Sequence, residues 1–134
     1  MTTTINYIGN LRTESTHVKS GTKILSDAPT DNQGKGETFS PTDLMSNALA
    51  QCTLTIMGIK ANENGWNIDG SHAELVKIMG VNPRRVSEIQ INFYMKGNFD
   101  KKTQIILENA GKACPVSKSL HPDLIQNMTF IWGN

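Results

Sequence analysis

Cys52 and Cys114 are the residues of this sequence with the most distinctive chemistry. A thiolate can attack the O–O bond of a peroxide and become a sulfenic acid, and a second thiol can then condense with that acid to form a disulfide. The two Cα atoms must lie within about 7 Å of one another for a disulfide to form. The two thiols are therefore suited to a redox cycle if folding brings their sulfur atoms together.

Each cysteine also has a simpler interpretation. On spacing alone, Cys52 is a small apolar side chain inside a core helix, where free cysteines are common. Cys114 precedes Pro115, which suits a first helical turn, so Cys114 is expected at or next to an N-cap. The positive end of the helix dipole favours a thiolate there, although a capping cysteine can also be unreactive. A structural hypothesis therefore treats both thiols as inert.

Other catalytic chemistries have less support. The cysteines form no CxxC pair, and with His17, His72 and His121 they show no recognisable zinc spacing. No GxGxxG or GxxxxGK[ST] motif indicates a nucleotide site, and Ser46 and Ser117 lack the GxSxG context of a nucleophilic serine. We rank serine hydrolysis well below thiol redox chemistry.

A cation near a cysteine would stabilise its thiolate. Arg12 is a candidate because its guanidinium is permanently charged and forked, although a solvated strand arginine is the more common interpretation. His17 would act in the same way only when protonated, and is otherwise a surface histidine. A strand meander at residues 3–8, 11–18 and 22–25 is expected to place Arg12 and His17 near one another.

The element that must position Cys52 is a long helix, expected over residues 41–64 and closed by Gly65. Ser40 suits its N-cap, and Thr42 and Asp43 are most simply first-turn residues that serve the cap and the dipole. Most of the helix circumference is expected to be buried. The apolar residues with helical spacing predict one buried face: Met45, Ala48, Leu49, Cys52, Ile56 and Ile59.

The remaining elements predict an α+β fold rather than alternating α/β, because strands are expected at both ends and helices between them. A loop rich in Gly, Pro, Asp and Asn is expected at residues 27–37. After the long helix we expect strands at 66–78 and 86–96, a second helix capped by Asp100 with Ile105, Ile106 and Ala110 on its apolar side, and a last strand at 128–132.

The composition bounds the class of protein. The 134 residues, 37% hydrophobic and 19% charged, predict a single globular domain spanning 1–134. A formal net charge of +1 gives no reason to expect nucleic acid or membrane as a partner. The first residues lack a cationic start and an apolar run, so no signal peptide is expected. We therefore expect a cytoplasmic protein whose cysteines are normally reduced.

Two segments together resemble the OsmC/Ohr family. FSPTDLMSNALAQC, residues 39–52, is similar to the family's helix-opening motif, in which a proline begins a long helix with a reactive cysteine near its centre. ACPVSKSL, residues 113–120, is similar to its second cysteine motif. The resemblance covers essentially the full chain, and the SPTDL sequence before the helix is most similar to the general OsmC-like branch.

The resemblance implies an α+β fold with antiparallel β-sheets around a long central helix bearing Cys52, in an intertwined homodimer with active sites at its interface. It implies reduction of organic hydroperoxides with a dithiol reductant and without a metal or flavin cofactor. Cys52 would be the peroxidatic thiol and Cys114 the resolving thiol, although the dipole argument favours Cys114 as the thiolate. Arg12 lies where the family's thiolate-stabilising arginine is expected.

One position departs from the family pattern. The peroxidase branches carry a glutamate directly after the helix-opening proline, where this chain has Thr42, with Asp43 one residue later. One helical residue is a rotation of about 100°, so Asp43 is not expected to replace that glutamate directly. The departure motivates an alternative function, a non-catalytic OsmC-like protein that binds a small molecule and has weak or no peroxidase activity.

Overall fold

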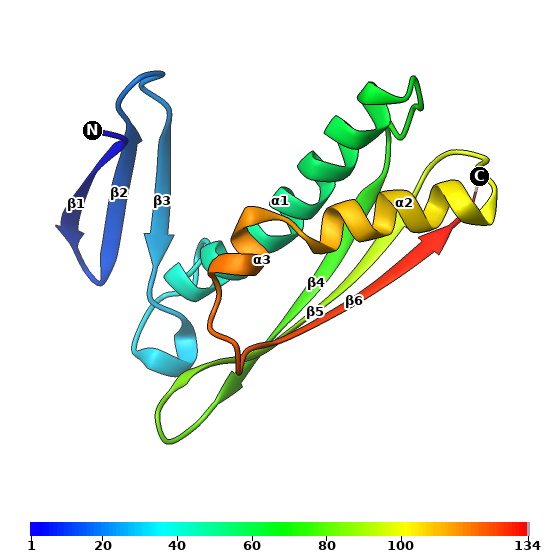
Figure 1. Cartoon of the computed structure of the whole chain (residues 1–134). Coiled ribbons are helices and arrows are strands. Elements are labelled where there is room, and N and C mark those ends of the chain that lie inside the picture. The colour runs from blue at the N-terminus through cyan, green and yellow to red at the C-terminus, as the bar shows by residue number, and fades with distance from the viewer. Residues whose placement is uncertain (134) are drawn as a thin grey trace. The chain divides into compact units, whose positions relative to one another are not determined.

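The computed structural model describes residues 1–133 and contains two compact units, Met1–Met45 and Ser46–Asn134 (Figure 1). Strands occupy both ends of the chain and helices lie between them in sequence, so the α+β prediction is confirmed. Within the described residues, no helix is both long enough and apolar enough to cross a lipid bilayer.

The N-terminal unit contains the predicted meander, in which β1 (Thr3–Gly9), β2 (Arg12–His17) and β3 (Lys23–Asp27) form an antiparallel sheet in that order. A short 3₁₀ turn, η1 (Thr30–Asn32), follows. Strand β3 extends two residues beyond the predicted strand. Asp27 was therefore wrongly expected in a loop, and it instead pairs with Arg12 across the sheet.

The expected proximity of Arg12 and His17 is wrong. Arg12 is paired with Gly9 and lies at the start of β2, whereas His17 is paired with Thr3 and lies at its end. Five residues of strand separate them by roughly 17 Å at about 3.3 Å per residue. The His17 ring is hydrogen-bonded to the Ser20 hydroxyl at 2.6 Å instead.

Helix α1 (Pro41–Glu63) confirms the long helix to within one residue of the predicted end. Its start is a reciprocal capping box, in which the Ser40 N–H donates to Asp43 Oδ2 over 2.9 Å and the Asp43 N–H donates to Ser40 Oγ over 3.0 Å. The Thr42 hydroxyl lies 3.2 Å from Ser40 Oγ. Gly65 follows the helix with a φ of 69°, the left-handed conformation that favours glycine.

The predicted buried face of α1 is confirmed only in part, since Leu49 is fully buried. Met45 and Ile59 are 36% and 49% exposed, and Cys52 and Ile56 are half-buried at the edge of the core. Small and polar side chains form most of the buried stripe, because their size allows close packing, and the Thr53 hydroxyl donates to the Leu49 carbonyl within the helix. The buried residues of α1 are Ser46, Leu49, Ala50, Thr53, Met57 and Ala61.

The C-terminal unit contains a sheet of β4 (His72–Gly80), β5 (Arg85–Met95) and β6 (Ile125–Trp132), in that order. Strands β4 and β5 are antiparallel, but β5 and β6 are parallel, so the expectation of purely antiparallel sheets is wrong for β6. Parallel pairing requires a crossover, which here contains α2 (Lys101–Lys112) and α3 (Pro115–Ser119). The helices of this unit lie on one side of the sheet (Figure 1).

The first strand of this sheet begins six residues later than predicted. Asn67 Oδ1 accepts a hydrogen bond from the Asp69 N–H over 2.7 Å, and the Ile68 carbonyl accepts one from the Ser71 N–H over 3.1 Å. Gly70 adopts a φ of 87° between them. This turn uses the backbone groups that the predicted strand would have needed.

The core of the C-terminal unit lies between the sheet and its helices. The alternation predicted for β5 is confirmed, since Ile89, Ile91, Phe93 and Met95 are all buried. Helix α2 is capped by Asp100 as predicted, through a 2.9 Å bond from the Thr103 N–H. However, the apolar residue of α2 that is buried in the core is Leu107, whereas Ile105 is 43% exposed. The buried face of α2 is therefore rotated relative to the predicted one. Ile106 and Ala110 are half-buried.

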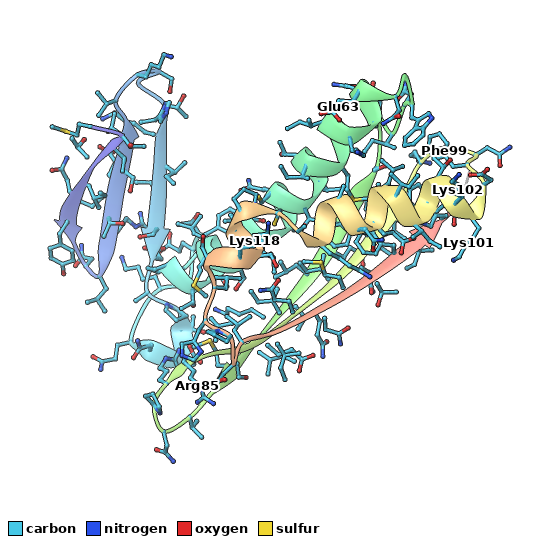
Figure 2. The ribbon with its side chains drawn as sticks, viewed as in Figure 1. Glu63, Arg85, Phe99, Lys101, Lys102 and Lys118 are labelled. Atoms are coloured by element: carbon cyan, nitrogen blue, oxygen red, sulfur yellow. The ribbon has the colours of Figure 1, made fainter. Side chains whose placement is uncertain are left out.

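Aromatic residues at the start of α2 and at the end of β6 pack against one another. The ring of Phe99, which Figure 2 shows next to Lys101 and Lys102 at the start of α2, meets Trp132 edge-on with centroids 6.0 Å apart. Trp132 Nε1 donates to Glu108 Oε2 over 2.8 Å. These contacts hold β6 against α2 at the C-terminal end of the strand.

Helices α1 and α2 pack closely at Gly111, which is buried. A Cβ added to Gly111 would lie 2.8 Å from Met57 Cγ and 2.9 Å from Thr53 Cγ2, both shorter than ordinary contacts. Thr53 is β-branched and stiff, so it has little freedom to move away. The absence of a side chain at Gly111 therefore sets how closely the two helices approach.

We predict that Gly111→Ala lowers the free energy of unfolding by roughly 1–3 kcal/mol, the usual effect of overpacking a core. Gly58→Ala is the matched control, since Gly58 lies within α1 and an added Cβ would meet no atom within 4 Å. That change should raise stability by up to about 1 kcal/mol through helix propensity. Urea denaturation of both variants measures the effects, and equal responses would contradict the packing argument.

Candidate functional site: a pair of thiols

The structure brings the two cysteines together. Cys52 lies near the middle of α1, and Cys114 is the N-cap of α3, as the Pro115 pattern predicted. Both are free thiols, and the Cys114 side chain lies close enough to the Cys52 thiol to raise its pKa. Cys114 is fully buried, whereas Cys52 is half-buried and thus more accessible.

Backbone N–H groups of α3 interact with both sulfur atoms. The Ser117 N–H donates to Cys114 Sγ over 3.4 Å, and the Val116 N–H lies close enough to the Cys52 sulfur to lower the pKa of its thiol. The Lys118 N–H closes the turn by donating to the Cys114 carbonyl over 3.1 Å, and its side chain is exposed on α3 (Figure 2). One short turn thus contacts both thiols.

Thr53 supplies a further polar contact to Cys114. Its hydroxyl donates to the Leu49 carbonyl over 2.9 Å, and its oxygen lies 3.8 Å from Cys114 Sγ. A hydroxyl carries one proton, so Thr53 acts as an acceptor towards the Cys114 S–H. Sequence reasoning did not find this contact, because Thr53 has no motif of its own.

Burial raises the pKa of the Cys52 thiol above its ordinary value of 9.0. The Val116 N–H opposes this by stabilising the thiolate, and the neighbouring Cys114 raises the pKa further. No positive side chain contributes to the shift among the described residues. Within its own unit, Cys52 is therefore neutral at pH 7 and needs a cation to become a nucleophile.

The predicted cation, Arg12, is held by two carboxylates in the N-terminal unit. Its Nε and Nη2 donate to Asp27 Oδ1 and Oδ2 over 2.7 and 2.9 Å, a bidentate pair, and Nη2 lies 3.6 Å from Glu37 Oε2. Asp27 Oδ2 also accepts the Glu37 N–H over 3.0 Å. The Arg12 guanidinium holds the pKa of Asp27 below its ordinary value of 3.8, although burial opposes this.

Sequence reasoning missed both carboxylate partners of Arg12. Asp27 and Glu37 were assigned to a polar loop, and only the register of β2 against β3 places Asp27 opposite Arg12. Thr42 and Asp43 serve the helix cap, as described above. The pairing of Arg12 with Cys52, and any support from His17, Thr42 or Asp43, stay predictions because those residues belong to the other unit.

Within residues 1–133, no group of three or more His, Cys, Asp or Glu side chains is arranged so that it could hold a metal ion. The chemistry that the geometry offers is that of the two sulfur atoms themselves. A neutral, half-buried thiol lies beside a second, fully buried thiol, and backbone donors are directed at both.

Comparison with known proteins identifies the same family that the two cysteine motifs resemble. The sequence model of the family described as OsmC-like protein matches residues 34–126. A solved Psychrobacter arcticus structure, provisionally named an osmotic stress induced and detoxification response protein, is 48% identical, with a TM-score of 0.94 over 97% of this chain and 95% of that chain. No curated protein matches the chain significantly.

More distant solved structures share the fold. The organic hydroperoxide resistance protein OsmC of Legionella pneumophila is 14% identical, with a TM-score of 0.73 over 98% of this chain and 97% of that chain. The organic hydroperoxide resistance protein OhrB of Bacillus subtilis is 18% identical, with a TM-score of 0.60 over 99% and 98%.

We predict that Asp27→Asn destabilises the protein at pH 7, and that its difference from the wild type shrinks in acid. The folded-state pKa of Asp27 is depressed, so the ion pair contributes fully above about 3.8 and loses its contribution as the pH falls through the folded-state value. Urea denaturation at pH 7 and pH 3 measures this. Asp123→Asn, at a side chain that is 90% exposed, should change stability little at either pH.

Proposed function

Because the chain belongs to the OsmC-like family, we propose that it is a thiol-dependent peroxidase that reduces organic hydroperoxides through Cys52 and Cys114. The observation that carries the proposal is that the two thiols lie close enough to interact electrostatically, although they are far apart in sequence. The names of the Legionella pneumophila and Bacillus subtilis proteins, which refer to organic hydroperoxide resistance, support the same substrate class.

The proposed cycle has three balanced steps. The Cys52 thiolate attacks one oxygen of the hydroperoxide, the O–O bond breaks, and Cys52 becomes a sulfenic acid while the alkoxide takes a proton and leaves as an alcohol. The sulfur of Cys114 then attacks the Cys52 sulfur, water leaves, and a disulfide forms. A dithiol reductant supplies two electrons and two protons to restore both thiols.

The different surroundings of the two thiols support this order of events. Cys52 is the more accessible to a peroxide, whereas Cys114 is buried next to the Thr53 hydroxyl. A resolving cysteine needs to approach one sulfur atom rather than a substrate from solvent. Burial of Cys114 is compatible with that role and unfavourable for a first attack.

Activation of Cys52 requires a positive charge that offsets the effect of burial, and we assign this role to Arg12. Asp27 and Glu37 hold the guanidinium in one orientation. The resemblance implies the same role for the glutamate that follows the helix-opening proline in the peroxidase branches. The ion pair with Asp27 thus offers a reason why Thr42 can replace that glutamate.

We also propose a homodimer, because the described chain leaves large apolar side chains uncovered. Ile5, Tyr7 and Ile8 of β1 are 59%, 67% and 50% exposed. Burying apolar area of this kind contributes about 25 cal/mol per Å², which favours association of two copies. Analytical ultracentrifugation tests the assembly, and a monomer at micromolar concentration would contradict it.

We predict that Cys52→Ser abolishes turnover of cumene hydroperoxide with a dithiol reductant, because it removes the proposed nucleophile. Cys114→Ser should retain one oxidation event and stop at the sulfenic acid, which dimedone traps as an adduct visible by intact-mass analysis. In the wild type the same analysis should find a loss of about two mass units on peroxide addition, as disulfide formation requires. A wild type without peroxide-dependent loss of thiols would refute the proposal.

We predict that Arg12→Met slows peroxide oxidation of Cys52 at pH 7 by roughly 10-fold or more, because losing a cation raises the pKa of the thiol by about one unit or more. Arg12→Lys keeps the charge but not the bidentate fork, so its oxidation rate should lie between those of the wild type and Arg12→Met. Stopped-flow measurement from pH 6 to 10 tests this. An unchanged pH profile in Arg12→Met would remove Arg12 from the site.

A second candidate function is small-molecule binding with little or no peroxidase activity. The raised pKa of Cys52 favours it, since a neutral thiol is a poor nucleophile but is compatible with a binding site. Thr42 in place of the family's glutamate favours it as well. A ligand that co-purifies and is identified by native mass spectrometry, together with background peroxidase activity, would support this candidate.

A further inference from the structure

The side-chain amide of Gln126 on β6 holds Ser117 of α3 at two points. The Ser117 hydroxyl donates to Gln126 Oε1 over 2.5 Å, and Gln126 Nε2 donates to the Ser117 carbonyl oxygen over 2.9 Å. Both residues are half-buried. Because two separate bonds join one side chain to one residue, they fix the orientation of Ser117 as well as its position.

Gln126 occupies a position in β6 where its neighbours are apolar. The alternating inner-face residues of the strand are Gln126, Met128, Phe130 and Trp132, all half-buried, and the last three pack against the core. A primary amide in such a row is unfavourable unless its donor and acceptor are satisfied. The two bonds to Ser117 satisfy both, which gives this polar residue a defined partner.

The residue that Gln126 holds belongs to the turn that contacts both thiols. The N–H of Ser117 donates to Cys114 Sγ, and the N–H of the preceding Val116 stabilises the thiolate of Cys52. Helix α3 has only five residues, and so short a helix has little stability of its own. Its orientation therefore depends on what attaches it to the rest of the unit.

We propose that Gln126 is a positioning residue for the two thiols. By clamping Ser117 to the sheet, it keeps the first turn of α3 in the orientation that directs one N–H at each sulfur. It thereby sets the reactivity of Cys52 and keeps Cys114 beside it. The consequence for peroxide turnover rests on the proposed function, whereas the effect on thiol reactivity does not.

The test is Gln126→Met, which keeps the length of the side chain and removes both hydrogen bonds. Loss of the N–H directed at Cys52 should slow its alkylation by iodoacetamide at pH 8 by roughly threefold and shift the pH profile upward by about half a unit. Peptide mass mapping assigns the modified cysteine. Melting temperatures show whether the variant is folded.

Variants of Ser117 test the same clamp from its other side. Ser117→Ala removes one of the two bonds and should give a smaller shift in the same direction, whereas Ser117→Thr keeps the hydroxyl and should behave as the wild type. Asn127→Leu is the matched control, because Asn127 is exposed on the other face of β6 and bonds to Glu88 at 3.3 Å. It should leave the alkylation profile unchanged.

The outcomes separate this proposal from the peroxidase proposal. A folded Gln126→Met protein with the wild-type alkylation profile would overturn the positioning role, as would an equal shift in Asn127→Leu. If Gln126→Met does not fold, the contrast between Ser117→Ala and Ser117→Thr decides. A shift in the Gln126 variant, in a protein that does not react with peroxide, would support the positioning role while refuting the peroxidase.

Discussion

The packing of α2 against α1 at Gly111 is the constraint on which the thiol pair depends. Gly111 lies three residues before Cys114, and it packs against Thr53, the residue that follows Cys52. The same contact that fills the core therefore sets the separation of the two sulfur atoms. The site is part of the core of this unit, since Cys114, Thr53 and Met57 are all fully buried.

Burial has opposite effects on the geometry and on the chemistry of the site. It holds the sulfur atoms next to one another, but it also disfavours the charged form of Cys52. Backbone N–H groups of α3 compensate in part, and a full positive charge is the remaining requirement. In the proposed function this charge comes from Arg12, which Asp27 holds in one orientation within the N-terminal unit.

Sequence patterns predicted those features that a few neighbouring residues determine. The cap at Ser40, the cap at Cys114 and the alternation of β5 were all confirmed, because each rests on local hydrogen bonding or on a two-residue period. The fold class followed from the order of these elements. The resemblance of two short motifs predicted the family, which the match over residues 34–126 confirmed.

The wrong predictions concern features that depend on contacts between residues distant in sequence. The buried side of α1 contains Ser46 and Thr53, which a count of apolar residues ignores, and only the packing of α2 identifies that side. Asp27 is the last residue of a strand that was predicted too short, so its pairing with Arg12 became visible only through the strand register. The parallel pairing of β6 depends on a crossover of two helices, which no local pattern encodes.

The location of the two thiols on α1 and α3 has a thermodynamic consequence. A bond between them would close a loop of about 60 residues and reduce the conformational entropy of the denatured chain, which in the loop-closure treatment corresponds to about 4 kcal/mol. Formation of the crosslink would thus tie the long helix to the crossover between β5 and β6. The oxidised protein would therefore have a higher melting temperature than the reduced one, and the melting temperature would indicate whether the two thiols had been oxidised.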